Sequence, residues 1–283
     1  MESDVADSVE ELLHAADDPA ADPNEIVDVL RSFDSVRDEA LVQAAAALLG
    51  HPLPEVRLEL AMFLGRVGVE CETPAVAPLL RLMADESESV RYWACYSLGS
   101  LRADSPEIRE AFFDGTGDFM PQVRAECVEA LARRRDSEVA PIVEAALEDP
   151  EELESQYLAA AAWLGLPAFA EALESVVPWD ELSAEFREAA LDRCDPARTE
   201  DRTEQLSSLL AAVTAAVQTR QPTWAVAMSE HRFGRRPHPS EELSITDQEG
   251  NVVGYGAWAL LHARGGGSPE EAAAIVMGDL FRE

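Results

Sequence analysis

The amino-acid sequence predicts an all-α fold, a solenoid in which antiparallel helix pairs stack one after another. The first observation is a repeat: Val56, Val90 and Val123, spaced 34 and 33 residues apart, each precede an arginine and open near-copies of one helix. Periods of 20–50 residues are typical of stacked supersecondary units. The second observation is that turn and capping residues, mainly Pro and Asp, divide the chain into segments of about three helical turns with short connections. The third is composition, 47% hydrophobic but only 6% aromatic, because small side chains let helices approach closely.

The predicted helices follow these breaks in order. Turn and capping pairs such as Asp18-Pro19 and Thr73-Pro74 separate them. Gln156 and Phe186 take the valine position in two weaker copies, so five copies of the repeated helix are expected. In chain order, helices are expected near 5–16, 24–33, 37–49, 54–68, 74–84, 88–102, 105–114, 121–134, 137–147, 151–164, 168–177, 181–193 and 203–218.

The C-terminal part departs from the repeat. Residues 230–242 are rich in Pro and Arg, and residues 242–256 alternate enough to predict a short β-hairpin around Gly250. An irregular repeat is the alternative, because residues 255–264 are helical in composition.

A final helix is expected after Ser268, because Ser268 is a typical N-cap and Pro269 suits the first helical position. Terminal repeats must cover the open end of an array, and we expect this helix to do so. The sequence therefore predicts a repeat body at 1–219 and an atypical C-terminal repeat or capping segment at 220–283.

The repeated segment carries a recognisable motif. The pattern V-R-x-x-A-x-x-x-L-G, after an acidic or Pro-containing turn, resembles HEAT-like repeats of the kind also found in bacterial lyase-associated HEAT proteins. The resemblance is most specific over 54–135 and extends over 20–200. It implies a right-handed α-solenoid, and because such proteins are mostly binding scaffolds, it implies function only in general terms.

The charge is strongly acidic, with 22 basic and 55 acidic residues and a formal net charge of −33. Such a field repels nucleic-acid phosphates and anionic lipid heads. The expected partner is therefore another protein with a basic or amphipathic segment, rather than nucleic acid or a membrane. The alternative is that the acidity serves solubility, or reflects a salt-rich or high-GC source.

Helical phase divides each repeated helix into two faces. With the valine as position zero, positions 0, +4, +7 and +8 form an apolar stripe expected in the core. This stripe consists of Val56, Leu60, Phe63, Leu64, Val90, Ala94, Ser97, Leu98, Val123, Cys127, Ala130 and Leu131. The resemblance implies that the opposite face lines the concave groove. Its positions +2 and +6 are Leu58, Met62, Tyr92, Tyr96, Ala125, Glu129, Leu158, Ala162, Glu188 and Asp192.

Three aromatic residues close together on one helix, Tyr92, Trp93 and Tyr96, stand out from this face. Tyr and Trp are enriched at binding hot spots. The core stripe of this helix already contains Val90, Ala94 and Leu98, so the three aromatics are not needed to complete it. The alternative is that they pack between adjacent repeats. The predicted partner-binding set, with acids for charge complementarity, is Leu58, Met62, Tyr92, Trp93, Tyr96, Glu129, Glu188 and Asp192.

Arginines form two further groups. Arg57, Arg91 and Arg124 resemble a basic ladder, but we expect them to bond carboxylates or carbonyls in the turn of the adjacent repeat, where acids already lie. A candidate anion- or partner-binding loop, whose alternative is a solvated loop, comprises His231, Arg232, Arg235, Arg236 and His238.

No catalytic residue, cofactor or metal site is predicted. The histidines form no H-x-x-x-H or H-E-x-x-H, and no G-x-S-x-G is present. The enzyme alternative is an alkylpurine DNA glycosylase-like protein built on HEAT-like repeats, in which Tyr92, Trp93 and Glu129 would form the site. Such enzymes use a basic groove, whereas this repeat body is acidic.

The four cysteines, Cys71, Cys95, Cys127 and Cys194, form no C-x-x-C pair and are expected to be free thiols in a reducing compartment. No signal pattern opens the chain, and the longest apolar run, 158–169, is too short to span a bilayer. We therefore expect a cytoplasmic, non-catalytic adaptor or scaffold, of which an inhibitor or toxin-neutralising protein is a subtype.

Overall fold

The computed structural model describes residues 2–18, 21–33, 38–68, 72–149, 153–233, 236–255 and 267–281. The chain forms two compact units, Met1–Leu164 and Gly165–Glu283, and each is described by itself. The division at 219/220, which rests on the repeat pattern rather than on compactness, stays a prediction.

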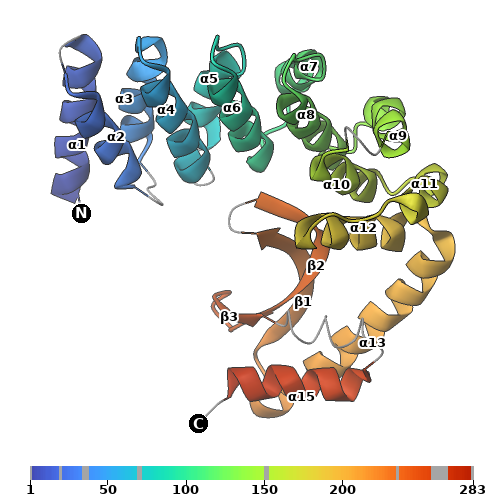
Figure 1. Ribbon diagram of the computed structural model, residues 1–283. Coiled ribbons are helices and arrows are strands. Elements are labelled where there is room, and N and C mark those ends of the chain that lie inside the picture. The colour runs from blue at the N-terminus through green and yellow to red at the C-terminus, as the bar shows by residue number, and fades with distance from the viewer. Residues whose placement is uncertain are drawn as a thin grey trace. The chain divides into compact units, whose positions relative to one another are not determined.

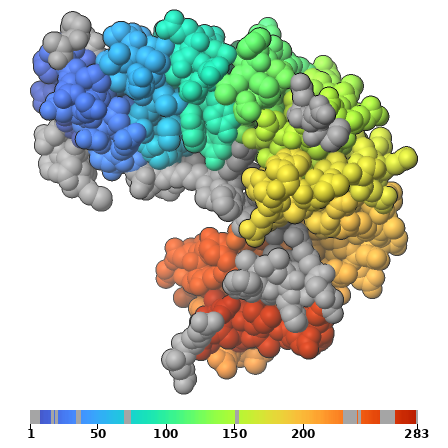
Figure 2. All heavy atoms as spheres, in the orientation of Figure 1, coloured from blue at the N-terminus to red at the C-terminus, as the bar shows by residue number. Residues whose placement is uncertain are grey.

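Five helix pairs follow one another in the described residues of the first unit (Figure 1). Helix α4 packs on α6, α6 on α8 and α8 on α10, while α5, α7 and α9 pack on the second helix of their own pairs. In Figure 2 the atoms of successive pairs abut in chain order, which confirms the predicted stack. The elements are α1 (Glu2–Asp17), α2 (Pro23–Arg31), α3 (Glu39–Ala46), η1 (Ala47–Gly50), α4 (Pro54–Gly68), α5 (Glu72–Leu82), α6 (Glu88–Ser100), α7 (Pro106–Gly115), α8 (Pro121–Arg133), η2 (Ser137–Val139), α9 (Ala140–Glu148) and α10 (Ser155–Leu164).

The helices begin where capping side chains and prolines favour it. The Asp38 carboxylate accepts hydrogen bonds from the backbone N–H groups of Ala40 and Leu41 at the start of α3. Ser105 accepts from the backbone N–H of Ile108 at the start of α7, and Pro106 takes the first helical position. These contacts satisfy donors that have no partner within the helix, which explains why α3 and α7 begin at these residues.

The core of the first unit lies along the predicted stripe. Each of the twelve side chains at positions 0, +4, +7 and +8 of α4, α6 and α8 is at most 5% exposed. The sequence phase is therefore confirmed in all three copies, including the polar Ser97.

The second unit begins with one further helix pair and then changes character. Helix α11 packs on α12, and α12 packs on α13. Its strands form an antiparallel sheet in the order β1-β2-β3, and α13 and α15 pack against each other beside it (Figure 1). The elements are η3 (Pro167–Phe169), α11 (Ala170–Ser175), α12 (Glu181–Cys194), α13 (Pro196–Arg220), β1 (Ala225–Phe233), β2 (Arg236–Thr246), β3 (Val252–Tyr255) and α15 (Pro269–Leu280).

A separate hydrophobic core joins the sheet to these two helices. One face of the sheet contributes Leu243 and Ile245, and the helices contribute apolar side chains at helical spacing. The buried members are Leu209, Val213, Val217, Leu243, Ile245, Ala272, Ala273 and Val276. The predicted final helix is confirmed as α15, with a capping box between Ser268 and Glu271.

The predicted hairpin is confirmed as β2–β3. Asp247 accepts hydrogen bonds from the backbone N–H groups of Glu249 and Asn251, both at 2.9 Å. Gly250 has a φ of +85°, a conformation that glycine adopts without steric cost. The irregular-repeat alternative rested on residues 255–264, of which 256–264 lie outside the described residues.

Strand β1 was not predicted, and the loop expected at 231–238 is wrong. His231 and Arg232 lie in β1, Arg236 and His238 lie in β2, and Arg235 lies outside the described residues. The sequence analysis recognised this stretch only as rich in Pro and Arg and predicted no strand in it. Strand β3 pairs with β2 only at Ser244–Thr246, so the part of β2 that contains Pro237 and Pro239 has β1 as its described neighbour. Proline is tolerated in a strand where its missing N–H is not needed by a neighbouring strand.

Candidate functional site

The arginine of each Val-Arg pair closes the turn before its own helix. Arg57 Nη1 donates to the carbonyl oxygen of His51 at 2.7 Å, six residues earlier. Arg91 Nη1 donates to the Asp85 carbonyl at 2.9 Å, and Arg124 Nη1 donates to the Asp118 carbonyl at 3.0 Å. The same offset recurs in all three copies, so this contact belongs to the repeat.

Two of these arginines, Arg57 and Arg91, also connect successive repeats. Arg57 binds the Asp85 carboxylate through Nε and Nη2 at 2.6 and 2.9 Å, and Arg91 binds Asp118 at 2.7 and 3.0 Å. Hydrogen bonds from Arg91 hold the pKa of Asp118 below its ordinary value. Bidentate pairs of this kind are strong and directional. The prediction that Arg57 and Arg91 act as structural struts between repeats is therefore confirmed.

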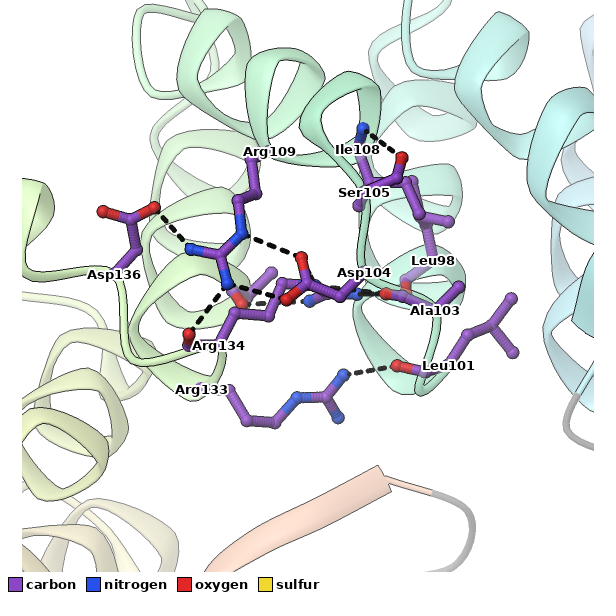
Figure 3. Close-up of polar contacts among 11 residues, drawn as sticks. Leu98, Leu101, Ala103, Asp104, Ser105, Ile108, Arg109, Arg133, Arg134 and Asp136 are labelled. Atoms are coloured by element: carbon purple, nitrogen blue, oxygen red, sulfur yellow. Dashed lines mark hydrogen bonds and ion pairs between the residues drawn. The ribbon is translucent and has the colours of Figure 1, made fainter.

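Arginines of the fourth helix pair, α7 and α8, also connect it to the preceding pair. Figure 3 shows Arg109 between Asp104 and Asp136, with Nη1 to Asp136 at 2.7 Å. Arg133 and Arg134 donate to backbone carbonyls in the connection after α6, at 2.8 Å in each case. These guanidinium groups satisfy carbonyls that the helix end leaves without partners.

The aromatic residues of α6 form a compact cluster. The Tyr92 and Trp93 rings meet edge to face with centroids 5.6 Å apart, and the Trp93 and Tyr96 rings do so at 5.2 Å. All three side chains are half-buried, while the core residues Val90 and Leu98 of the same helix are fully buried. Part of each ring therefore remains accessible to a binding partner.

Leu58 and Met62 hold the equivalent positions on α4, the helix that packs against α6. Both side chains are half-buried. We call the five residues Leu58, Met62, Tyr92, Trp93 and Tyr96 the α4–α6 surface. It is the part of the predicted groove in which two neighbouring helices each contribute partly exposed apolar side chains.

The groove positions of the next two copies are buried instead. Glu129 on α8 is 3% exposed, and Ala125, Leu158 and Ala162 are 0% exposed. Helix α10 is apolar on every side, a pattern typical of a fully buried helix. Helical phase alone did not predict that these positions are buried. The continuous apolar run from Tyr157 to Trp163 could have indicated it.

The remaining predicted acids lie in the second unit and already have basic partners. Arg198 Nη2 contacts Glu188 at 2.7 Å and Asp192 at 2.8 Å. Arg187 also binds Glu188, and Arg202 binds Asp192. Their negative charge is therefore partly neutralised by their own unit.

Two of the buried cysteines, Cys127 and Cys194, have thiols that resist deprotonation. Cys95 and Cys127 lie on α6 and α8 with their Sγ atoms 3.4 Å apart, and Cys71 lies outside the described residues. The neighbouring Cys95 thiol and burial raise the pKa of Cys127, and burial raises that of Cys194 to about 12. Because the thiolate is the nucleophile, these thiols are poor ones. Within the described parts of the chain, no three His, Cys, Asp or Glu residues are grouped as metal ligands would be.

Two exposed aromatic side chains were not predicted from the sequence as surface residues. Phe119 is 94% exposed and Trp179 is 50% exposed, each in a turn between the helices of a pair. The available signal was a large apolar residue beside an aspartate in a predicted turn, in a chain with few aromatics.

Comparison with known proteins identifies the family. A family model of HEAT repeats matches residues 6–99 and 76–164, which together span more than half of the chain. Among solved structures, the X-ray structure of Escherichia coli YibA matches with 15% identity and a TM-score of 0.42, over 65% of this chain and 81% of that chain. No curated protein matches. No described helix is both long and apolar enough to cross a membrane. Since the repeat match covers more than half of the chain and the helix pairs stack as repeats, the chain belongs to the HEAT-repeat family.

Proposed function

We propose that this protein is a non-catalytic scaffold that binds a basic or amphipathic segment of another protein on the α4–α6 surface. The single observation that carries the proposal is the edge-to-face cluster of Tyr92, Trp93 and Tyr96, which remains partly exposed although the core of α6 is complete. Rigid aromatic side chains supply large contact area at low entropic cost, and they dominate binding hot spots.

Charge supports the choice of partner. The net charge of −33 attracts basic proteins and repels phosphate backbones and anionic membranes. Near the α4–α6 surface, Glu55 and Glu88 lie exposed in the first turns of α4 and α6. An amphipathic helix could place its apolar side chains on the aromatic cluster and its basic side chains beside these carboxylates. An inhibitor that neutralises a basic toxin or enzyme would fit the same chemistry.

A photo-crosslinking amino acid in place of Tyr92 would capture the partner in cells. The matched control carries the same amino acid in place of Tyr255, an exposed tyrosine on β3 of the second unit. We expect a protein adduct at position 92 that is absent at position 255. Recovery of the same adducts at both positions, or tight binding of duplex DNA at ordinary salt, would contradict the proposal.

The captured partner then allows an affinity test. The double variant Tyr92→Ala/Tyr96→Ala should bind at least roughly 30-fold more weakly, because losing a hot-spot aromatic costs about 2 kcal/mol. Tyr255→Ala should bind like the wild type. The wild-type affinity should fall as salt rises, since exposed charges are screened. An affinity insensitive both to the double variant and to salt would refute the proposed surface.

A further inference from the structure

The turn between α11 and α12 exposes a short run of apolar side chains. Val177 is 82% exposed, Trp179 is 50% exposed and Leu182 is 41% exposed, with the exposed Pro178 between the first two. We call these four residues the Trp179 surface. Single exposed apolar residues are ordinary, whereas several together, including a tryptophan, are typical of an interaction site.

The backbone beneath this surface is held at both ends. Val176 is buried at the start of the turn, and Asp180 caps α12 by accepting from the Ser183 backbone N–H at 2.7 Å. The backbone N–H groups of Trp179 and Asp180 both donate to Ser183 Oγ, at 3.1 and 3.0 Å. The apolar side chains therefore stand on an ordered turn, which reduces the entropy lost when a partner binds.

Arg187 follows Phe186, which takes the valine position in the fifth copy of the repeated helix. Unlike Arg57, Arg91 and Arg124, it does not bond the turn before its own helix. Arg187 Nε and Nη2 donate to the carbonyl oxygens of Leu173 and Glu174 at the end of α11, at 2.9 and 3.1 Å. Its Nη1 binds Glu188. The guanidinium group is thus directed at the end of the preceding helix, and Glu188 pairs with its charge.

Exposed acidic residues flank the apolar run in the sequence. Residues 167–186 contain five acidic residues and no basic residue. All five are exposed, namely Glu171, Glu174, Asp180, Glu181 and Glu185. A second copy of this chain would bring the same acids against them, and a phosphate-bearing partner would be repelled as well. A segment with basic residues around apolar ones matches both features of the surface.

We propose that the Trp179 surface is a docking site for a short, positively charged amphipathic helix of a partner protein. The apolar side chains of the helix would cover Trp179, Val177 and Leu182, and its arginines or lysines would face the flanking carboxylates. The Trp179 surface consists of residues of the second unit and shares none with the α4–α6 surface, so it does not depend on the function proposed for that surface.

A synthetic helix can test the site directly. The probe is a fluorescein-labelled peptide of about 14 residues, or four helical turns, with leucines on one face and arginines on the other. Fluorescence anisotropy of the probe gives its Kd for the full-length protein. We expect Trp179→Ala to bind at least about tenfold more weakly, since a central tryptophan is a typical hot spot. Phe119→Ala removes a turn aromatic of the first unit that is even more exposed than Trp179, and it should not change the Kd.

Two controls separate specific docking from attraction to an acidic protein. A peptide with the leucines replaced by alanine keeps the charge and should bind weakly, with equal affinity for the wild type and Trp179→Ala. Glu181→Gln should weaken the original peptide, while Trp179→Phe should retain much of its binding. Circular dichroism of every variant establishes that folding is unchanged.

The outcomes distinguish this proposal from the one for the first unit. If Tyr92→Ala/Tyr96→Ala abolishes binding of the peptide and Trp179→Ala does not, the peptide binds the α4–α6 surface and the Trp179 proposal is wrong. Equal Kd values for the wild type and Trp179→Ala would overturn it without affecting the α4–α6 surface. Self-association of the wild type that Trp179→Ala removes would also overturn it, because the occupant would then be a second copy.

Discussion

Replacing Asp118 with asparagine removes a charge from the link between the second and third Val-Arg helices while leaving the shape of the side chain intact. Asparagine can still accept from the Met120 backbone N–H, which Asp118 now does at 2.8 Å, so the turn keeps its cap. The bidentate pair with Arg91 is lost. The Arg91 and Asp118 side chains are only 18% and 12% exposed, so water replaces the lost contact poorly.

The magnitude follows from this partial burial. Breaking a fully buried ion pair costs about 3–5 kcal/mol, whereas an exposed pair contributes about 0–1 kcal/mol. We expect Asp118→Asn to lower the free energy of unfolding by about 2 kcal/mol, near the value for hydrogen bonds to charged groups. Arg91→Met should cost more, because it also removes the hydrogen bond to the Asp85 carbonyl oxygen. The double variant should cost less than the sum, with a coupling energy of about 1.5 kcal/mol or more between the two sites.

Amide hydrogen exchange, resolved by mass spectrometry of peptides from α6 and α8, measures the opening free energy of this part of the chain. The matched control is Glu188→Gln, which breaks a pair with Arg198 whose side chains are 51% and 37% exposed. It should cost less than about 1 kcal/mol, read from thermal unfolding. A coupling energy below about 0.5 kcal/mol between positions 91 and 118 would refute the assignment of this arginine as a strut.

Three further outcomes are expected. Because hydrogen bonds from Arg91 lower the pKa of Asp118, its stabilising contribution is present above about pH 4 and is lost as the pH falls through its folded pKa; acid unfolding followed by circular dichroism should therefore be steeper for the wild type than for Asp118→Asn. Gly65→Ala should lower the midpoint of urea unfolding, because a Cβ there would lie 2.4 Å from Ser97 Oγ and 3.2 Å from Ser97 Cα. At the equivalent position in the next repeat, the added Cβ of Gly99→Ala meets nothing nearer than 3.5 Å, so this variant should raise the midpoint through helix propensity. Equal shifts of the midpoint in the two variants would contradict this. Raising NaCl from about 0.1 to about 1 M should raise the melting temperature, since salt screens repulsion among the acids of a chain with net charge −33; a melting temperature that falls with salt would contradict this reasoning.

Local spacing carried most of what could be predicted about the repeat body. Positions 0, +4, +7 and +8 of a helix lie on one side of it whatever surrounds the helix, so the core stripe from Val56 to Leu131 could be read in advance. The same geometry placed Tyr92 and Tyr96 away from that stripe. The role of Arg57 and Arg91 followed from their constant distance to acidic turns, which the repeat period fixes.

Contacts between distant parts of the chain decided the rest. Whether Glu129 or Leu158 is buried depends on what packs over them, and their own helical phase does not contain that information. Strand β1 (Ala225–Phe233) forms because it pairs with β2. The prolines of β2 gave no indication in the sequence that such a partner strand exists.

The sequence by itself determined the fold family, the core stripe and the surface on which aromatic side chains gather, because these depend on periodicity along one helix. Only the tertiary structure decided that Glu188 and Asp192 pair with arginines of α13 and that Trp179 projects from an ordered turn. The physical reason is that exposure and ion pairing depend on neighbours brought together by folding.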